Sequence, residues 1–165
     1  MSTFVAVGNA NQTFARLLDE VAKHACDLPS PVVVQHGHTT FSAPCCEACD
    51  FMDRERFSEE ISRAEVIILH AGAGSVLDTL RAGKTPIIVP RKACYGEHVN
   101  DHQVELASKL ESEGLVVVLD DVTKLPEAVS RLRSGSIAKP GGDVQPDLVM
   151  KVAEVIDDYA NKLAN

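Results

Sequence analysis

The sequence predicts an α/β protein in which one open, mainly parallel sheet carries helices on both faces. Short apolar runs alternate along the chain with segments of helical period, and this alternation is typical of β-α-β units. Hydrophobic residues make up 45% of the chain, whereas aromatic residues make up 4% and tryptophan is absent. A core of Val, Ile, Leu and Ala suits strands buried on both faces. A chain of 165 residues has room for one such core, so we expect a single domain over residues 1–165.

The first half of the chain predicts two clear strands, a weaker one and two helices. Residues 3–8 and 32–35 are strand-like apolar runs. Between them, residues 11–26 carry apolar side chains at helical spacing, and prolines follow that segment and end the helix. A weaker strand signal at residues 50–52 follows a cysteine-containing loop, and residues 53–64 predict a short helix.

The second half continues the alternation. The predicted order is strand 66–69, helix 75–82, strand 86–89, helix 100–113, strand 115–119 and helix 123–132. The entirely apolar strand 66–69 is expected at the centre of the sheet. Residues 134–146, rich in Gly, Pro and Ser, predict a loop, and a C-terminal helix over 147–163 follows with Asp147 as its cap.

The charge balance excludes one large class of function. The formal net charge is −8, from 24 acidic and 16 basic residues, and no basic cluster exceeds the pair Arg91-Lys92. Such a field repels a polyphosphate backbone, so no nucleic acid partner is predicted. The N-terminus lacks the basic start and long apolar run of a targeting segment, and no stretch approaches the roughly 20 apolar residues of a membrane span. We therefore expect a cytoplasmic protein.

Five cysteines form an odd number, and without a secretion signal they predict reduced thiols. Cys45, Cys46 and Cys49 cluster in one loop, downstream of His36 and His38, so four zinc ligands are conceivable. One Cys-x-x-Cys pair with this spacing is a weak zinc signal, however. An ordinary thiol-containing loop is favoured over zinc or a redox pair, and no metal site is predicted.

A glycine-rich turn is the most informative segment. The strand 66–69 runs into His70-Ala-Gly-Ala-Gly-Ser75 and then into a helix. Such a turn lets backbone N–H groups approach an anion closely, and the helix N-terminus adds partial positive charge. A diphosphate fits this pattern, although a tight turn that needs glycine for positive φ also explains it.

Two better-known phosphate motifs fail on spacing. The dinucleotide fingerprint needs a glycine where Leu77 stands. Gly83-Lys84-Thr85 fails as a P-loop because the earlier glycine of that motif would fall on Asp78, and because the segment follows a helix and precedes a strand. Neither NAD nor ATP is indicated.

Polar residues follow three predicted strands. Asp78 lies one turn into the helix after Ser75, where a carboxylate can accept both hydroxyls of a ribose or simply oppose the helix dipole. A long polar loop, residues 90–103, leaves the strand 86–89. Because ligands of open α/β sheets sit over the carboxyl ends of the strands, Gly8-Asn9, the glycine-rich turn and this loop are expected to converge on one crevice. Its amide, imidazole and carboxylate groups suit a polyhydroxylated sugar, although a solvated loop is the plain alternative.

Two segments together, His70-Ala-Gly-Ala-Gly-Ser-Val-Leu-Asp78 and Tyr95-Gly-Glu-His-Val-Asn-Asp-His-Gln-Val-Glu-Leu-Ala107, resemble the C-terminal domain of family 28 glycosyltransferases. The similarity runs from Phe4 to about Leu132 and is strongest to stand-alone members. These are the catalytic subunit of the two-chain UDP-N-acetylglucosamine transferase of dolichol-linked oligosaccharide synthesis, and bacterial exopolysaccharide transferase subunits. The resemblance implies a Rossmann-like domain, the C-terminal donor-binding half of a GT-B fold.

The resemblance also implies roles for individual residues. The diphosphate positions are matched by His70, Gly72, Gly74 and Ser75, and the ribose position by Asp78, where the family usually has Glu. Met52 falls near the position whose backbone reads uracil. Gly8 and Asn9 match the first loop beside the phosphates. His102 and Gln103 match the pair that touches the donor sugar, and Glu97 is expected among the donor-binding residues too. The extra residue in Gly83-Lys84-Thr85-Pro86 and the Asn at position 9 depart from the family pattern.

The function implied is inverting transfer of a sugar from a UDP-sugar, with UDP-N-acetylglucosamine favoured, to a lipid-linked acceptor. The UDP-sugar is a substrate, and no cofactor or divalent metal is expected. The chain has no sequence for an acceptor domain, so a membrane-attached acceptor-binding subunit is expected to recruit it to the cytoplasmic face of a membrane. His98 and His102 are the internal candidates for the general base, which otherwise belongs to the partner. A non-catalytic accessory subunit and a nucleotide-sugar-binding module are the alternatives.

Overall fold

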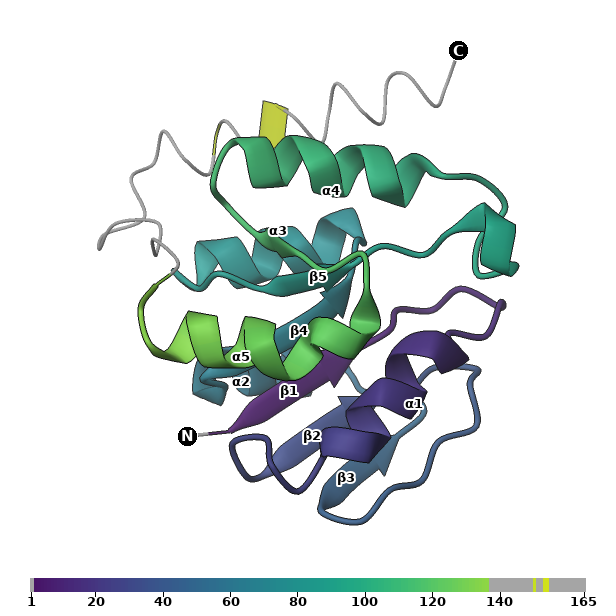
Figure 1. Ribbon diagram of the computed structural model, residues 1–165, viewed down its shortest axis with the longest axis vertical. Coiled ribbons are helices and arrows are strands. Elements are labelled where there is room, and N and C mark those ends of the chain that lie inside the picture. Colours follow the sequence, from purple (N-terminus) through teal and green to yellow (C-terminus); the bar gives the residue numbers. More distant parts are fainter. Residues whose placement is uncertain (1, 137–149, 151–152, 155–165) are drawn as a thin grey trace.

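The computed structural model describes residues 2–136, 150 and 153–154. Within them, six strands form one parallel sheet in the order β3-β2-β1-β4-β5-β6 (Figure 1). The strands are β1 Thr3–Ala6, β2 Val32–Gln35, β3 Cys46–Cys49, β4 Val66–His70, β5 Ile87–Val89 and β6 Val117–Val118. The helices are α1 Ala15–His24, α2 Arg54–Arg63, α3 Ala73–Arg81, α4 His102–Ser112 and α5 Leu125–Arg133, with 3-10 turns η1 Ala93–Tyr95 and η2 Val122–Lys124. The predicted parallel α/β fold is confirmed, whereas the loop 134–146 and the helix 147–163 lie almost wholly outside the described residues.

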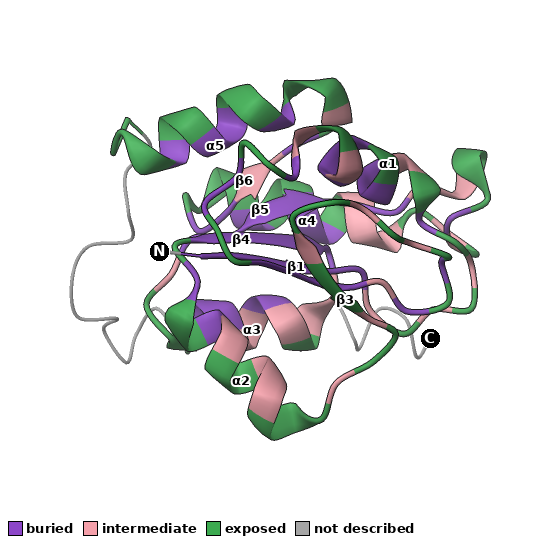
Figure 2. Ribbon diagram, turned by 90° about the horizontal axis from the view of Figure 1, so that it is seen from below, coloured by how far each residue is buried: buried purple, intermediate pink, exposed green. Residues whose placement is uncertain are grey.

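Two helical layers enclose the sheet (Figure 2). Alternate residues of each strand point to opposite faces, so Val5 packs against α1 and α5 while Phe4 packs against α2, α3 and α4. Both faces of β1, β2 and β4 are buried along their full length. This is the burial expected of a parallel sheet and explains the aliphatic, unalternating strand sequences.

The sheet reverses its strand order between β1 and β4. The chain runs from β1 outward to β2 and β3, then crosses back to place β4 on the other side of β1. The predicted central position of β4 is confirmed, since β4 pairs with β1 and β5. Loops that leave β1 and β4 therefore begin side by side at the switch point, where open α/β sheets bind ligands.

The cysteine segment differs from its prediction. Cys46–Cys49 forms the edge strand β3, whereas the sequence placed a weak strand at residues 50–52 and left these cysteines in a loop. Cys45, which precedes β3 with a φ of 65°, is disulfide-bonded to Cys26 after α1. The expectation of reduced thiols is therefore wrong for this pair, because folding brings the two Cα atoms to 5.3 Å.

Two further findings concern metals and membranes. In the part of the chain that the structure describes, no group of three or more His, Cys, Asp and Glu side chains is arranged to hold a metal ion. Over the same residues, no helix combines the length and the apolar character that crossing a membrane would require.

Candidate functional site

Three loops start next to one another at the carboxyl edge of the sheet. Ala6 is in register with Leu69, and His70 with Val89. The segments that follow β1, β4 and β5 therefore leave the sheet side by side, as the sequence predicts.

The imidazole of His70 lies against two glycines of these loops. A Cβ built on Gly8 would be 2.5 Å from His70 Nε2, and one built on Gly72 would be 2.1 Å from the same atom. Both distances are shorter than the non-bonded contacts that real Cβ atoms make. Gly8 also has a φ of +78°, which favours glycine. Packing against His70 thus requires glycine at both positions before any ligand is considered.

His70 is neutral at physiological pH. Its ring is buried, with Nδ1 3.4 Å from the carbonyl oxygen of Ala6. Burial, reinforced by the nearby positive charge of Arg91, lowers the pKa of His70 to about 4. A diphosphate at this edge would therefore meet an uncharged imidazole, which acts by shape and hydrogen bonding.

The N-terminus of α3 opens onto the same edge. The helix begins at Ala73, two residues earlier than predicted, so Gly74 and Ser75 lie in its first turn. Gly72 is its N-cap in an extended conformation, without a side-chain cap, so N–H groups of the first turn lack intrahelical acceptors. Among the described residues, nothing lies within 4 Å of a Cβ built on Gly74. An anion can therefore approach these N–H groups closely.

Asp78 lies on α3 beyond this turn. Its side chain is 38% exposed, and the Arg81 guanidinium is 3.8 Å away, a weak surface pair. Asn9 is exposed in the first loop. Met52 is half-buried against the core under α2 and α3, next to Asp53, which caps α2. Asp78 and Asn9 thus remain accessible for a ligand at this edge.

The β5–α4 loop, residues 90–101, leads into α4 at its far end. Gln103, in the first turn of α4, accepts a hydrogen bond at Oε1 from the backbone N–H of Arg91, with 3.1 Å between the two atoms. Asp101, the N-cap residue of α4, instead accepts from the N–H of Ala93 at 2.8 Å. Both bonds connect the start of the loop to the start of α4, so a second helix N-terminus is fixed near the site.

The two histidines of this region lie close to Asn100. His98 Nδ1 is 3.1 Å from Asn100 Oδ1, which also accepts from the backbone N–H of His102 at 3.2 Å. The side chain of His102 is 36% exposed, with Nδ1 3.9 Å from a carboxylate oxygen of Glu105. Neither contact assigns a catalytic base.

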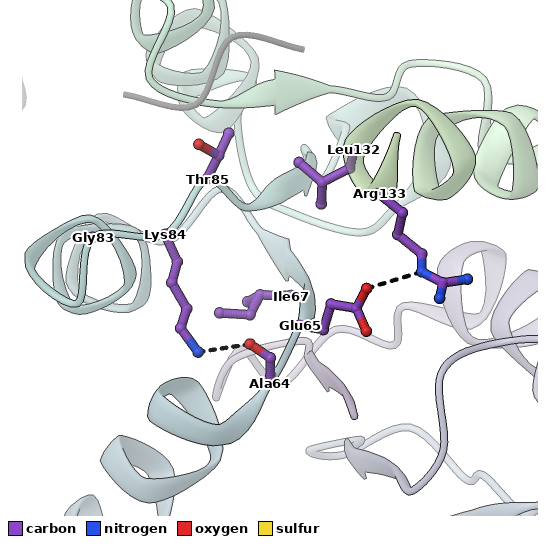
Figure 3. Close-up of a pocket in the computed structure, with 8 residues that line it drawn as sticks. All are labelled: Ala64, Glu65, Ile67, Gly83, Lys84, Thr85, Leu132 and Arg133. Carbon is purple, nitrogen blue, oxygen red and sulfur yellow. Dashed lines mark hydrogen bonds and ion pairs between the residues drawn. The ribbon is translucent and has the colours of Figure 1, made fainter. Parts of the chain in front are cut away.

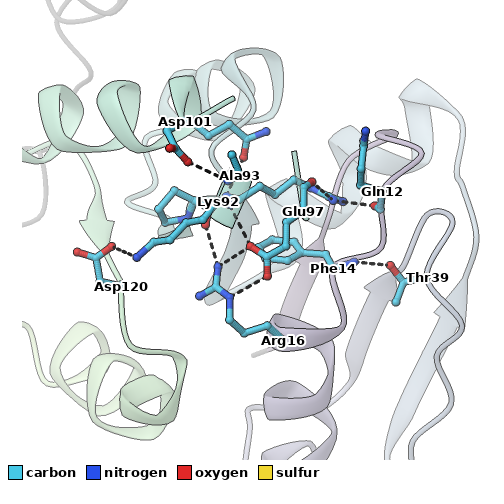
Figure 4. Close-up of polar contacts among 12 residues, drawn as sticks. Gln12, Phe14, Arg16, Thr39, Lys92, Ala93, Glu97, Asp101 and Asp120 are labelled. Carbon is cyan, nitrogen blue, oxygen red and sulfur yellow. Dashed lines mark hydrogen bonds and ion pairs between the residues drawn. The ribbon is translucent and has the colours of Figure 1, made fainter. Parts of the chain in front are cut away.

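Glu97 makes contacts within the protein that the sequence did not predict. The residue is buried, and its carboxylate accepts two hydrogen bonds from Arg16, at 2.8 and 2.9 Å, and one from the N–H of Lys92 at 3.0 Å (Figure 4). Both oxygens are therefore occupied by protein donors. Glu97 fixes the loop to α1, and its contact with a donor sugar stays a prediction.

Sequence reasoning missed the role of Arg91. It noted Arg91 and Lys92 as the largest basic cluster of the chain. Lys92 pairs with Asp120 at 3.2 Å, whereas Arg91 is 1% exposed and donates to main-chain carbonyls only, within the described residues. A basic residue soon after a buried strand was the available signal, and it does not distinguish a surface cation from a buried one.

A separate hollow lies at the opposite edge of the sheet. Its volume is about 250 Å³, and it is lined by residues around the amino ends of β4 and β5 and by the end of α5 (Figure 3). Lys84 donates there to the carbonyl of Ala64, and Arg133 pairs with Glu65. Because these charges already have partners, the hollow does not compete with the carboxyl edge as the candidate site.

A parallel sheet with a glycine turn and a helix N-terminus at its switch point defines a Rossmann-like domain. The model of the glycosyltransferase family 28 C-terminal domain matches residues 3–140, most of the chain. The chain therefore belongs to this family, as its motifs predict.

Solved structures identify the fold more closely. The calicheamicin glycosyltransferase CalG4 is similar with a TM-score of 0.65 and 20% identity, over 99% of this chain and 44% of that one. A solution structure of ALG13 is similar with a TM-score of 0.55 and 19% identity, over 84% of this chain and 86% of that one. At these identities the similarity shows the fold alone, and the predicted half of a GT-B fold is confirmed.

Curated relatives share short stretches of higher identity. The UDP-N-acetylglucosamine transferase subunit ALG13 of Homo sapiens is 41% identical over 61 residues, which cover 37% of this chain and 5% of that protein. The subunit of the same name from Yarrowia lipolytica is 47% identical over 51 residues, covering 31% of this chain and 24% of that protein. The matches span well under half the length of these relatives.

Proposed function

We propose that this chain binds the UDP-sugar donor of a two-component inverting glycosyltransferase, with UDP-N-acetylglucosamine as the favoured donor. The observation that carries the proposal is the uncapped first turn of α3, which begins at the glycine turn after the central strand β4. Backbone N–H groups and the helix dipole there suit a diphosphate. The names of the curated relatives support the donor sugar.

In the proposed reaction, an acceptor hydroxyl attacks the anomeric carbon as the bond to the β-phosphate oxygen breaks. The configuration inverts, UDP leaves with the bonding electrons, and the hydroxyl proton passes to a general base. The N–H groups at the start of α3 stabilise the charge that develops on the diphosphate, so no divalent metal is required. His98 and His102 are the candidates for the base within this chain, and otherwise the partner supplies it.

The second component is a further part of this proposal. CalG4 and this chain are similar over nearly all of this chain but over less than half of CalG4, so a GT-B enzyme has another half to supply. We assign that half to a membrane-attached subunit that binds a lipid-linked saccharide at the cytoplasmic face. The relatives are named as transferase subunits, which supports such a division.

Calorimetric titration tests the donor site. UDP, 2′-deoxy-UDP, UDP-N-acetylglucosamine, UDP-galactose and UDP-glucuronic acid are titrated into the unsubstituted chain, Asp78→Ala and the exposed control Asp19→Ala. We expect Asp78→Ala to weaken UDP binding by about ten- to a hundredfold, since a charged hydrogen bond contributes roughly 1.5–3 kcal/mol. The same substitution should change 2′-deoxy-UDP less, because part of the ribose contact is missing from that ligand.

Nucleotide binding and sugar transfer together distinguish a catalytic donor subunit from a non-catalytic one. No binding of any nucleotide would count against a donor site in this chain. Binding without transfer, even with the acceptor subunit and its lipid-linked saccharide present, would instead indicate a nucleotide-sugar-binding or accessory subunit.

A further inference from the structure

The side chain of Arg91 connects the loop after β1 with the β5–α4 loop. Its Nη1 atom donates to the carbonyls of Gln12, at 2.8 Å, and Glu97, at 3.0 Å. Its Nη2 atom donates to the carbonyl of Val7 at 2.8 Å. The two ends of the first loop and the middle of the β5–α4 loop are thus held by one side chain.

An aromatic ring and an ion pair complete this arrangement, which we name the Arg91 cluster: Phe14, Arg16, Arg91 and Glu97. The Arg91 guanidinium lies over the Phe14 ring, 4.6 Å from its centroid. Arg16, on the first turn of α1, holds the Glu97 carboxylate and also donates to the carbonyl of Pro90 at 3.0 Å. Figure 4 shows Arg16 and Glu97 directed toward each other from α1 and from the loop.

The main chain of Arg91 connects the Arg91 cluster to Gln103, the residue expected to contact the donor sugar. The N–H of Arg91 donates to Gln103 Oε1, so this oxygen of the amide is occupied by the protein. The amide NH₂ group then becomes the part of Gln103 that can donate to a sugar hydroxyl. A displacement of the Arg91 backbone therefore changes the direction of the Gln103 amide.

Burying the charged Arg91 side chain costs free energy, which indicates that the residue has a function. A guanidinium buried against main-chain carbonyls has lost its hydration, and within the described residues no carboxylate hydrogen-bonds to it. An apolar side chain would fill the same space without that penalty. A planar cation with donors on two sides is needed, however, to bind three carbonyls from two loops at once.

We propose that Arg91 is a positioning residue, which holds the β5–α4 loop and Gln103 in the geometry that reads the donor sugar. This inference rests on the proposed donor site. Arg91 has no direct contact with the diphosphate in this scheme. Its loss therefore affects recognition of the sugar more than recognition of UDP.

Two variants test the proposal. Arg91→Lys keeps the charge but loses the planar fork and its stacking on Phe14. Glu97→Gln keeps the shape but weakens the attachment of the loop to Arg16, and it leaves the buried Arg91 intact if Arg91→Lys does not fold. Lys92→Met is the matched control, since the neighbouring cation pairs with Asp120 outside the cluster.

Dissociation constants for UDP and UDP-N-acetylglucosamine are measured on each folded variant, with thermal unfolding as the folding check. Arg91→Lys and Glu97→Gln should lower the affinity for UDP-N-acetylglucosamine at least tenfold and that for UDP less than threefold, while Lys92→Met leaves both unchanged. Equal losses for both ligands, or no loss, would overturn the positioning role. If the unsubstituted chain binds UDP but does not discriminate UDP-N-acetylglucosamine from UDP, this inference fails alone; if it binds neither, the proposed function fails with it.

Discussion

His70 Nε2 occupies the space that the Cβ of any other residue at position 72 would need, since the two atoms would be 2.1 Å apart. This contact ties the glycine-rich turn to the strand that precedes it. Packing against His70 therefore requires glycine at position 72. At position 74 nothing in the described residues blocks a side chain, so only a bound ligand would require glycine there. Gly72 and Gly74 are two residues apart and make that comparison possible.

Gly72→Ala should destabilise the fold. The backbone of Gly72 is extended, with φ −85° and ψ 123°, so alanine fits the conformation and the cost comes from displacing the buried imidazole. We expect a loss of about 1–3 kcal/mol, as for other overpacked sites. Urea unfolding checks this, and an unchanged midpoint would mean that the ring moves aside freely.

Gly74→Ala should have the opposite effect on stability. The position lies inside α3 and its Cβ would meet nothing within 4 Å among the described residues, so alanine should stabilise the helix by about 0.5–1 kcal/mol. A methyl group beside the free N–H groups should nevertheless weaken UDP at least tenfold. Calorimetry on this more stable variant tests the diphosphate site without a folding defect, and full UDP affinity would argue against that site.

The pH dependence of stability should include a contribution from His70. Its folded pKa of about 4 lies below the ordinary histidine value, so the unfolded chain binds the proton more readily between these values. The contribution is complete above pH of about 6.5 and is lost as the pH falls toward 4, on the order of 3 kcal/mol in all. Urea unfolding at several pH values should show a shallower decline for His70→Asn than for the unsubstituted chain, with the exposed His38→Asn as control.

Reduction of the Cys26–Cys45 disulfide should lower stability without affecting the donor site. The bond closes a loop with a sequence separation of 19, for which chain entropy predicts about 3 kcal/mol. The double variant Cys26→Ser, Cys45→Ser should unfold like the reduced protein and should not respond to dithiothreitol. UDP affinity should stay constant, because both cysteines lie toward the amino ends of the strands.

Lys84→Met should weaken α2 specifically. Lys84 Nζ donates to the carbonyls of Ile61, Ser62 and Ala64 at 2.5–2.7 Å, so one ammonium satisfies the end of the helix. Losing these charge-assisted bonds should cost about 1–3 kcal/mol in urea unfolding. UDP affinity should be unchanged, and the exposed Lys109→Met should alter neither property.

Most of the fold could be predicted because its strands are buried on both faces. The strand at residues 32–35 has the predicted bounds, and Asp53 caps a helix that was predicted to start there. Strand β3 escaped prediction because it is an edge strand with two exposed central residues, Glu47 and Ala48, and no apolar run. Its place depends on pairing with β2, which periodicity alone does not reveal.

The site could be predicted only where local sequence determines local geometry. The glycine turn is such a case, because strand, glycines and helix are adjacent along the chain. The start of α1 is not: residues 11–13 were assigned to the helix but remain outside it, and the N–H of Phe14 donates instead to Thr39 Oγ1 at 2.8 Å. Glu97 and Arg91 likewise take their roles from partners about 80 residues away, Arg16 and Gln12.

The same long-range contacts set an order for protein synthesis. Val7 and Gln12 leave the ribosome long before Arg91, whose guanidinium binds their carbonyls. A nascent chain that ends after α3 already contains Gly8 and the glycine-rich turn, yet it lacks the side chain that connects the first loop to the loop before α4. The contacts of Arg91 can therefore form only after the loop before α4 has been translated, so the first loop stays without this attachment until then.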